Sequence, residues 1–393
     1  MTDVVVVGTG MAGVRAAEVL RQEGFTGTLT LIGAEDCGPY DRPPLSKQVL
    51  TGKSDVTDIA LLDAATRTGL KATWLTGMHA TAFDAGARTV RTSDGRRLTA
   101  DGLVVATGTR ARRLPAAEGW AGVHHLRTFS DARALRDALG VSHRVVVVGG
   151  GFIGAEVASV ARSLGKAVAM VEVERLPLQR QLGPAAAELL LQLHLRHGVE
   201  VVSGTGVEHF DGDHRVREVV LTDGSRLPAD LVVVGIGAEP NTEWLTESGI
   251  ECDNGVLTDE WCRTTIARVV AAGDVAAYRT RTGRLRIEHW TNARDMAAAA
   301  ARSLLTELAG ADVTELPRYD PLPYVWSDQY DRHIQIAGRP AGDDEFDIVG
   351  GSVAESFLAV YRRNHAITGV LAVDSPKEFG RIRRELRTRW ASR

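Results

Sequence analysis

An internal duplication constrains this chain more than any other feature of its sequence. Residues 4–13 read VVVVGTGMAG, and residues 145–154 read VVVVGGGFIG. A second pair follows in the same order, because residues 93–108 and residues 222–237 each hold an Asp-Gly pair, an apolar run and a closing glycine. The repeated unit of roughly 130–140 residues is too long for a solenoid. Two domains of one architecture are therefore expected.

Each copy predicts a strand, a helix and a second strand. The β-branched runs at 4–7 and 145–148 predict the first strands, and residues 28–32 and 167–171 predict the second. The helices between them carry apolar residues at helical spacing, namely Val14, Ala17 and Leu20 in one copy and Val157, Ala161 and Leu164 in the other. This order predicts βαβ units with parallel sheets, and the Asp-Gly pairs predict hairpins.

The last third of the chain departs from the repeat. Short apolar runs at 255–258 and 269–274 precede an Ala-rich helix expected at about 292–309. A third section begins near Arg318 and predicts strands followed by a basic helix over residues 377–390.

Both glycine turns match the strong form of the dinucleotide fingerprint. The glycines are Gly8, Gly10 and Gly13 in the first copy and Gly149, Gly151 and Gly154 in the second. Each turn follows a strand and opens a helix, and an acid, Glu35 or Glu172, follows the next strand. Such glycines let the backbone approach a pyrophosphate, and the acid binds ribose hydroxyls. The alternative is one true site and one degenerate copy.

Glu172 favours NAD over NADP, because a carboxylate accepts from a free 2′-hydroxyl and repels a 2′-phosphate. Arg175 and Arg180 lie close by in sequence and would soften that preference.

Composition excludes several classes. The net charge of −4 is too balanced for nucleic-acid binding by bulk charge, and no apolar run reaches the ~18 residues of a membrane span. Three cysteines cannot form a disulfide scaffold or hold a four-thiolate iron–sulfur cluster. No histidine or acid cluster suggests a metal. The opening strand shows no signal peptide, so a cytoplasmic location is expected.

Several segments resemble a known family. Residues 8–13, Thr107-Gly108 and Gly273-Asp274 resemble flavoprotein reductases that bind two dinucleotides. Residues 40–47 (YDRPPLSK), 288–290 (EHW) and 326–330 (WSDQY) resemble the ferredoxin reductases of oxygenase systems. The resemblance implies a glutathione-reductase-like α/β fold with two Rossmann-like domains and a C-terminal α+β interface domain. It implies FAD on the first copy and NADH, rather than NADPH, on the second.

The resemblance also implies domain boundaries and further site residues. The FAD domain would comprise residues 1–110 and 241–317, the NAD domain 111–240 and the interface domain 318–393. Beyond the six glycines and two acids, the candidate cofactor-binding residues are Ala12, Arg42, Lys47, Ala80, Thr107, Gly108, Arg127, Ile153, Arg180, Gly235, Gly237, Asp274, His289, Trp290, Thr291 and Trp326. Four of these residues have an ordinary alternative: Asp274 a helix N-cap, Arg127 a surface arginine, and Trp290 and Trp326 core residues.

Lys47 and Glu156 are the candidate catalytic residues. In the resembled family these positions form an ion pair beside flavin N5, which would order the nicotinamide. The alternatives are a solvated lysine and a glutamate that stabilises a helix N-terminus.

The cysteines decide where the electrons go. Thiol-using reductases of this fold need a Cys pair, but Cys37, Cys252 and Cys262 are isolated, and a catalytic Cys37 is disfavoured. Reduced flavin would then pass single electrons to an acidic iron–sulfur ferredoxin, and so to a haem-thiolate monooxygenase or a ring-hydroxylating oxygenase. The alternatives are a rubredoxin reductase, an NADH oxidase or a redox sensor of the apoptosis-inducing-factor type.

An acidic ferredoxin needs a basic docking face. The candidates are Lys377, Arg381, Arg383, Arg384, Arg387 and Arg389 on the last helix, with Arg339 and Arg362 as additions. The alternative is a solvated helix face.

Overall fold

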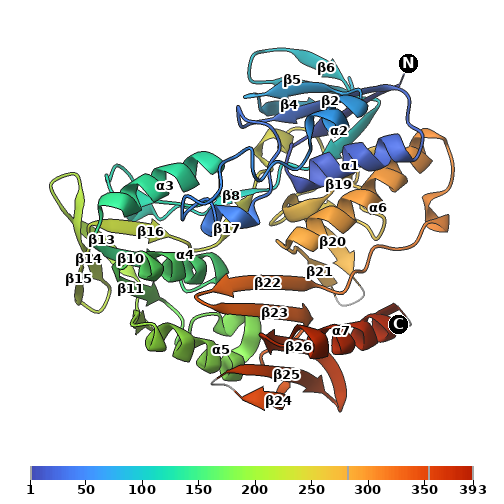
Figure 1. The fold of residues 1–393 in the computed structure, drawn as a ribbon. Coiled ribbons are helices and arrows are strands. Elements are labelled where there is room, and N and C mark those ends of the chain that lie inside the picture. The colour runs from blue at the N-terminus through green and yellow to red at the C-terminus, as the bar shows by residue number, and fades with distance from the viewer. Residues whose placement is uncertain (1, 281–282, 353–354, 392–393) are drawn as a thin grey trace. The chain divides into compact units, whose positions relative to one another are not determined.

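The computed structural model describes residues 2–280, 283–352 and 355–391 (Figure 1). Internal contacts group the chain into two units. Unit 1 comprises Met1–Asp41, Val56–Arg110 and Glu239–Pro323, and unit 2 comprises Arg42–Asp55, Ala111–Ala238 and Tyr324–Arg393. Residues 42–55 therefore group with unit 2, and the C-terminal section groups with the second repeat. Within the described residues, no helix is long and apolar enough to cross a membrane.

Unit 1 is built on a parallel sheet with the strand order β19-β7-β1-β2-β3. The strands are β1 (Asp3–Val7), β2 (Thr28–Gly33), β3 (Thr73–Thr76), β7 (Gly102–Val105) and β19 (Val269–Ala271). Valines dominate β1, β7 and β19, as expected for strands buried on both faces. The sheet continues from β1 to β2 on one side and to β7 on the other, so its connections reverse at β1, where ligands bind in such sheets.

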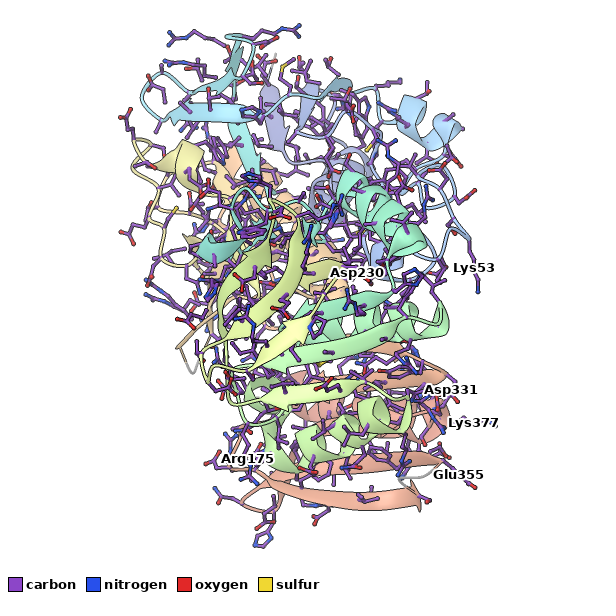
Figure 2. All side chains as sticks on the ribbon, turned by 90° about the vertical axis from the view of Figure 1, so that its left-hand side faces the viewer. Lys53, Arg175, Asp230, Asp331, Glu355 and Lys377 are labelled. Carbon is purple, nitrogen blue, oxygen red and sulfur yellow. The ribbon has the colours of Figure 1, made fainter. Side chains whose placement is uncertain are left out.

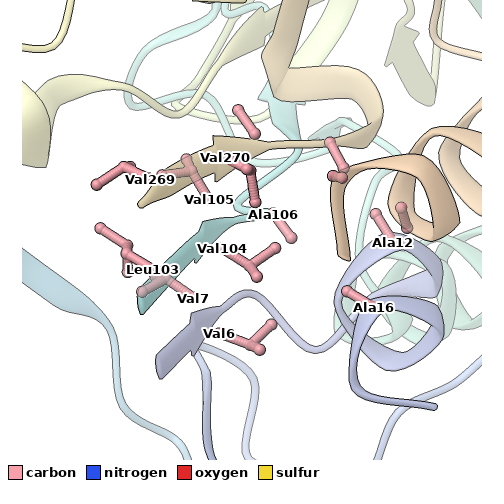
Figure 3. Packing of buried hydrophobic residues seen from close by; sticks show 14 of the residues in the cluster. Val6, Val7, Ala12, Ala16, Leu103, Val104, Val105, Ala106, Val269 and Val270 are labelled. Atoms are coloured by element: carbon pink, nitrogen blue, oxygen red, sulfur yellow. The ribbon is translucent and has the colours of Figure 1, made fainter. Parts of the chain in front are cut away.

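Helices α1 (Met11–Gln22) and α6 (Trp290–Leu308) pack against each other over this sheet through small side chains. Ala12 and Ala16 of α1 face the valines of β1 and β7 (Figure 3). Small residues let the helices approach the strands closely. The bounds of α6 agree with the expected Ala-rich helix.

The remaining elements of unit 1 are short. They are the meander β4 (Ala80–Asp84), β5 (Thr89–Thr92) and β6 (Arg97–Thr99), the strands β18 (Val256–Thr258), β20 (Ala276–Thr280) and β21 (Gly283–Leu285), α2 (Ala64–Gly69), and the 3₁₀ turns η3 (Glu243–Leu245), η4 (Gly273–Val275) and η5 (Val313–Glu315). The strands β8 (Thr109–Ala111) and β17 (Ala238–Pro240) lie where the chain passes between the units.

Unit 2 repeats the parallel architecture with the order β12-β11-β10-β16-β9. Its elements are η1 (Pro43–Ser46), η2 (Pro115–Ala117), β9 (Val123–His124), α3 (Phe129–Val141), β10 (Arg144–Val148), α4 (Phe152–Ser163), β11 (Ala167–Glu172), α5 (Gln179–Arg196), β12 (Glu200–Ser203), β13 (Val207–Gly212), β14 (Val216–Leu221), β15 (Arg226–Pro228) and β16 (Leu231–Val234).

The two copies agree beyond their strand order. In each, an aspartate after the hairpin accepts from the backbone N–H of the first residue of the leading strand. Asp101 Oδ2 lies 2.8 Å from Asp3 N, and Asp230 Oδ2 lies 2.9 Å from Arg144 N. The duplication that the sequence predicts is thus confirmed.

The C-terminal section forms an antiparallel sheet with the order β22-β23-β26-β25-β24, and α7 packs on β23 and β26 (Figure 1). These elements are β22 (Tyr324–Gln329), β23 (Arg332–Gly338), β24 (Glu345–Ser352), β25 (Ser356–Arg363), β26 (Ala366–Val373) and α7 (Pro376–Ala391). The predicted strands and basic helix are confirmed.

Helix α5 is broken near its start and shares a core with this sheet. Gly183 has φ of 76° and Pro184 follows it, so the helical hydrogen bonds are interrupted there. The Tyr361 hydroxyl donates to the Leu182 carbonyl at 2.9 Å. A side chain of the sheet thereby satisfies an acceptor that the break leaves open.

Candidate functional site

The first glycine turn has no room for side chains. Gly8 has φ of 117°, and a Cβ added there would lie 2.0 Å from the carbonyl oxygen of Ala106. A Cβ on Gly13 would lie 1.8 Å from the carbonyl oxygen of Gly8. Nothing lies within 4 Å of a Cβ placed on Gly10, the N-cap of α1, and no side chain caps this helix. Open space before uncapped N–H groups fits a pyrophosphate.

The second turn repeats this geometry. Gly149 has φ of 102°, and its Cβ would lie 2.4 Å from the carbonyl oxygen of Gly235. A Cβ on Gly154 would lie 2.0 Å from the carbonyl oxygen of Gly149. Gly151 again faces open space at the start of a helix that no side chain caps. Both turns therefore meet the steric conditions for a dinucleotide.

The acid of each copy is held in a different way. Glu172 ends β11, and its Oε2 accepts from Gly150 N at 2.7 Å while its Oε1 accepts from Glu174 N at 2.9 Å. The carboxylate is thus fixed to the glycine turn itself. Glu35 follows β2, and its Oε2 accepts from the Tyr40 hydroxyl at 2.6 Å.

The two arginines near Glu172 differ in their contacts. Arg180 forms an ion pair with Glu174, which raises the pKa of its guanidinium. Arg175 is exposed and projects from the surface (Figure 2). The carboxylate of Glu174 thus draws away a cation that could otherwise meet a 2′-phosphate.

The short turn η4 lies against α1, the helix that follows the first glycine turn. Gly273 has φ of 78°, and its Cβ would lie 2.9 Å from the Cβ of Ala12, so η4 packs tightly on α1. Asp274 is the middle residue of η4 rather than a helix N-cap. Asp274 therefore does not have the helix N-cap position that was its alternative, and its role in FAD binding stays a prediction.

The residues at the start of α6 have mixed partners. Trp290 Nε1 donates to Asp41 Oδ1 at 2.7 Å, and Thr291 follows in the first turn. His289 is the N-cap, and its Nδ1 is enclosed with no hydrogen-bond partner among the described residues. Burial lowers the pKa of His289 to about 4. An enclosed nitrogen without a partner at a helix N-terminus fits a site that a ligand completes.

Thr107 is tied to a residue far along the chain. Its hydroxyl donates to the Asn241 carbonyl at 2.8 Å, and Asn241 Nδ2 donates to the Thr107 carbonyl at 2.9 Å. Gly108 follows with φ of 62°, and Ala80 is buried at the start of β4. These contacts fix the loop after β7.

Lys47 and Glu156 form a buried ion pair in unit 2. Lys47 Nζ lies 2.7 Å from Glu156 Oε2, and only 4% of the Glu156 side chain is exposed. Lys47 follows the turn η1, whose Pro43 and Pro44 restrict the backbone, and Glu156 lies in the first half of α4. The contact excludes both a solvated lysine and an isolated helix glutamate.

The other candidates in unit 2 lie on separate elements. Arg42 donates to the Arg127 carbonyl at 2.5 Å, so these two are brought together. Trp326 stacks on Tyr324 in β22 with ring centroids 5.9 Å apart. Ile153 is 45% exposed in the first turn of α4, an unusual place for a large apolar side chain. Gly237, with φ of 101°, ends the loop after β16.

The three cysteines form no disulfide among the described residues. Cys37 is half-buried, Cys252 is exposed and Cys262 is buried. Burial raises the pKa of the Cys262 thiol, which makes it a poor nucleophile. Among the described residues, no group of histidine, cysteine or acidic side chains could hold a metal ion.

Four site contacts escape sequence reasoning. They are made by Ser46, Ser327, Asn241 and Tyr40, each a common polar residue without a diagnostic spacing. Tyr40 and Ser46 lie inside the segment 40–47 and Ser327 inside 326–330, so their positions gave some signal, whereas nothing in the sequence marked Asn241.

Two glycine turns on two parallel sheets, each with its acid, define the class of oxidoreductases that bind a flavin and a nicotinamide dinucleotide. The chain belongs to the pyridine nucleotide-disulphide oxidoreductase family, whose model matches residues 2–297. A reductase C-terminal model matches residues 324–391. The fold class, the enzyme class and the cofactors FAD and NADH are thereby confirmed.

The relatives are named as reductases, several of them as components of dioxygenase systems. The ferredoxin reductase component of chlorobenzene dioxygenase from Cupriavidus sp. (strain PS12) is 38% identical over 394 residues, covering 99% of this chain and 93% of that protein. Putidaredoxin reductase of Pseudomonas putida is 36% identical over 387 residues, covering 96% and 90%. The crystal structure of the covalent putidaredoxin reductase–putidaredoxin complex matches with a TM-score of 0.92 at 35% identity, covering 99% of this chain and 93% of that chain.

Proposed function

We propose that this chain oxidises NADH and passes the electrons singly to an iron–sulfur ferredoxin that serves an oxygenase. The observation that carries this proposal is that two complete dinucleotide turns occur in a chain whose three cysteines form no disulfide with one another. Without a dithiol, electrons that reach the flavin must leave to an external acceptor. The relatives, which are named as ferredoxin reductases, support the same acceptor.

FAD binds the first turn and NADH the second. In the proposal, Gly8, Gly10, Gly13 and Asp274 hold the FAD pyrophosphate and ribityl region, and Glu35 holds its ribose. Gly149, Gly151 and Gly154 hold the NADH pyrophosphate, and Glu172 its ribose. Bound FAD supplies the conversion of one hydride into two single electrons.

Lys47 and Glu156 are the residues proposed to assist hydride transfer. The ammonium of Lys47, fixed by Glu156, places a positive charge where the resembled family has flavin N5. Burial strengthens the electrostatic interactions of this ammonium, and the ion pair keeps its position fixed. We propose that the pair orders the nicotinamide and stabilises negative charge on the reduced cofactor.

Helix α7 is the proposed ferredoxin docking element. Arg381, Arg384 and Arg387 are exposed on it, and Lys377 projects outward at its start (Figure 2). Arg383 differs, because its guanidinium stacks on Tyr324 at 4.0 Å from the ring centroid. Arg389 forms an ion pair with Glu385 at 2.7 Å. The exposed positive charge proposed for docking therefore lies on Lys377, Arg381, Arg384 and Arg387.

Stopped-flow spectroscopy tests the proposal directly. The holoenzyme is mixed with NADH or NADPH while flavin bleaching is followed, and the reduced enzyme is then mixed with a ferredoxin of an oxygenase system. Fast bleaching by NADH and fast single-electron transfer are expected. Oxygen consumption without ferredoxin transfer would indicate an oxidase. Slow turnover with a change of oligomeric state would indicate a redox sensor.

We also propose a cytoplasmic location. NADH is a cytoplasmic reductant, and three cysteines that form no disulfide suit a reducing compartment.

A further inference from the structure

We propose that Ser327, supported by Gln329, is a positioning residue for the Lys47–Glu156 pair. The C-terminal domain would then control hydride transfer from NADH as well as partner docking. This inference deepens the proposed function and rests on it.

The two oxygens of Glu156 have separate partners. Oε2 accepts from Lys47 Nζ at 2.7 Å and from the Ser46 hydroxyl at 2.5 Å. Oε1 accepts from the Ser327 hydroxyl at 2.7 Å. The loop at η1 therefore holds one oxygen, and strand β22 of the C-terminal sheet holds the other.

Gln329 sets the direction of the Ser327 hydrogen bond. Its Nε2 donates to Ser327 Oγ at 3.1 Å, so the Ser327 hydroxyl hydrogen is left to point at Glu156. Ser327 and Gln329 are both fully buried, with 0% exposure, and Glu156 is 3% exposed. Water cannot easily replace a lost donor at this depth, and a buried polar chain of this kind fixes one geometry.

Strand β22 is attached to α4 at two successive turns. Ser327 bonds Glu156, and the backbone N–H of Tyr330 donates to Ser159 Oγ at 2.5 Å, one helical turn further on. The Tyr330 hydroxyl also meets His194 Nδ1 of α5 at 2.8 Å. Ser327 is thus held by its pairing with Ile334 of β23 and by the anchored Tyr330 three residues further on, and it does not depend on a loop for its position.

Removal of the Ser327 hydroxyl frees Oε1. The carboxylate can then rotate about its terminal bond, and Lys47 loses a fixed partner. A hydrogen bond to a charged group corresponds to roughly 10- to 100-fold in a rate that depends on it. We expect Ser327→Ala to lower the limiting rate of flavin reduction by that factor, with little change in the NADH concentration for half-maximal rate.

Three further variants distinguish the loss of the Ser327 hydroxyl from a general disturbance of the fold. Ser327→Thr keeps the hydroxyl and should restore most of the rate, and Gln329→Met, which removes the supporting donor, should give an intermediate loss. Ser248→Ala is the matched control, because Ser248 is also buried and its hydroxyl also donates and accepts, at 2.6 Å and 3.2 Å. It should leave the rate unchanged.

A double variant tests the route of the effect. If Ser327 acts through the ion pair, Lys47→Ala with Ser327→Ala should be no slower than Lys47→Ala alone. Losses that multiply would overturn the proposal.

Two further readouts separate this proposal from the proposed function. Amine labelling followed by mass spectrometry should modify Lys47 faster in Ser327→Ala than in wild type, relative to the exposed Lys53 (Figure 2). The rate at which ferricyanide oxidises the pre-reduced Ser327→Ala enzyme should stay within about twofold of the wild-type rate. Unchanged labelling and unchanged bleaching would refute the positioning role. A wild-type enzyme that bleaches but fails to reduce ferredoxin would refute only the proposed acceptor.

Discussion

At the scale of single residues, the glycines of the two turns are the least replaceable positions. Gly8 and Gly149 both have positive φ, and both would bring a Cβ within 2.4 Å of a carbonyl oxygen. Such contacts involve backbone atoms that cannot move aside. The pattern in the sequence already identified them, because only glycine satisfies this geometry.

The copies should lose different cofactors when these glycines change. Gly8→Ala should lower the FAD content of the purified protein at least tenfold, whereas Gly149→Ala should retain FAD and lose at least tenfold in flavin reduction by NADH. FAD absorbance and stopped-flow bleaching measure the two effects. Gly140→Ala is the control, because a Cβ there meets nothing within 4 Å. If both variants lost FAD equally, the assignment of the turns would be wrong.

Glu172 should control the choice of nicotinamide. Glu172→Ser removes the charge that repels a 2′-phosphate, so the ratio of kcat/KM for NADH to that for NADPH should fall roughly tenfold or more. Adding Glu174→Gln should lower it further, because Arg180 then loses its carboxylate partner. Steady-state kinetics with both nucleotides measure the ratio. A ratio that stayed constant would remove Glu172 from the ribose site.

Three of the four residues that sequence reasoning missed share one property. Ser46, Ser327 and Asn241 form hydrogen bonds with partners more than 100 residues away. Glycine turns and terminal acids have a fixed local spacing, whereas these contacts depend on tertiary packing. The sequence pattern therefore predicted the turns, and the family resemblance implied the ion pair, but neither could predict what holds the ion pair.

At the scale of elements, the sequence predicted the regular segments and missed an interrupted one. Strands β1 and β10 and helices α1 and α4 follow from clear periodicity. Helix α5 is absent from the sequence-based expectations, because Gly183 and Pro184 interrupt it and Tyr361 completes its hydrogen bonding from a distant strand. Helix α7 was predicted, but the sequence could not tell which of its arginines stack on aromatic rings.

Charge-removing variants of helix α7 should weaken ferredoxin docking without disturbing the packing of the helix. Arg381→Gln with Arg384→Gln should slow ferredoxin reduction several-fold at low salt and less at high salt, since the lost attraction is screened. NADH-to-dye activity should persist. Stopped-flow rates against ionic strength measure this, and Arg91→Gln with Arg97→Gln, exposed on the meander of unit 1, serves as the control. An equal loss of both activities would point to a folding defect.

At the scale of the whole molecule, a buried histidine should link folding to pH. Burial lowers the pKa of His194 to about 4, and His197 adds to the effect. The unfolded chain binds a proton near pH 6.5, so stability is full above that pH and is lost as the pH falls toward 4. Between pH 7 and pH 5 the loss is about 2 kcal/mol of unfolding free energy.

His194→Gln should flatten this dependence. The difference in thermal midpoint between wild type and variant, measured from pH 7 to pH 5, should shrink as the pH falls. His79→Gln, on the exposed surface of unit 1, should keep the wild-type slope. Parallel curves for wild type and His194→Gln would show that another group controls the acid limb.

The strand order of unit 1 also determines when that unit can fold. Its edge strand β19 begins at Val269, and α6, which packs on α1, ends at Leu308. The parallel strands of the second repeat all lie between Val123 and Val234. During synthesis on the ribosome, the later repeat can therefore complete its sheet first, while the apolar faces of β7 and α1 await partners that have not yet been translated.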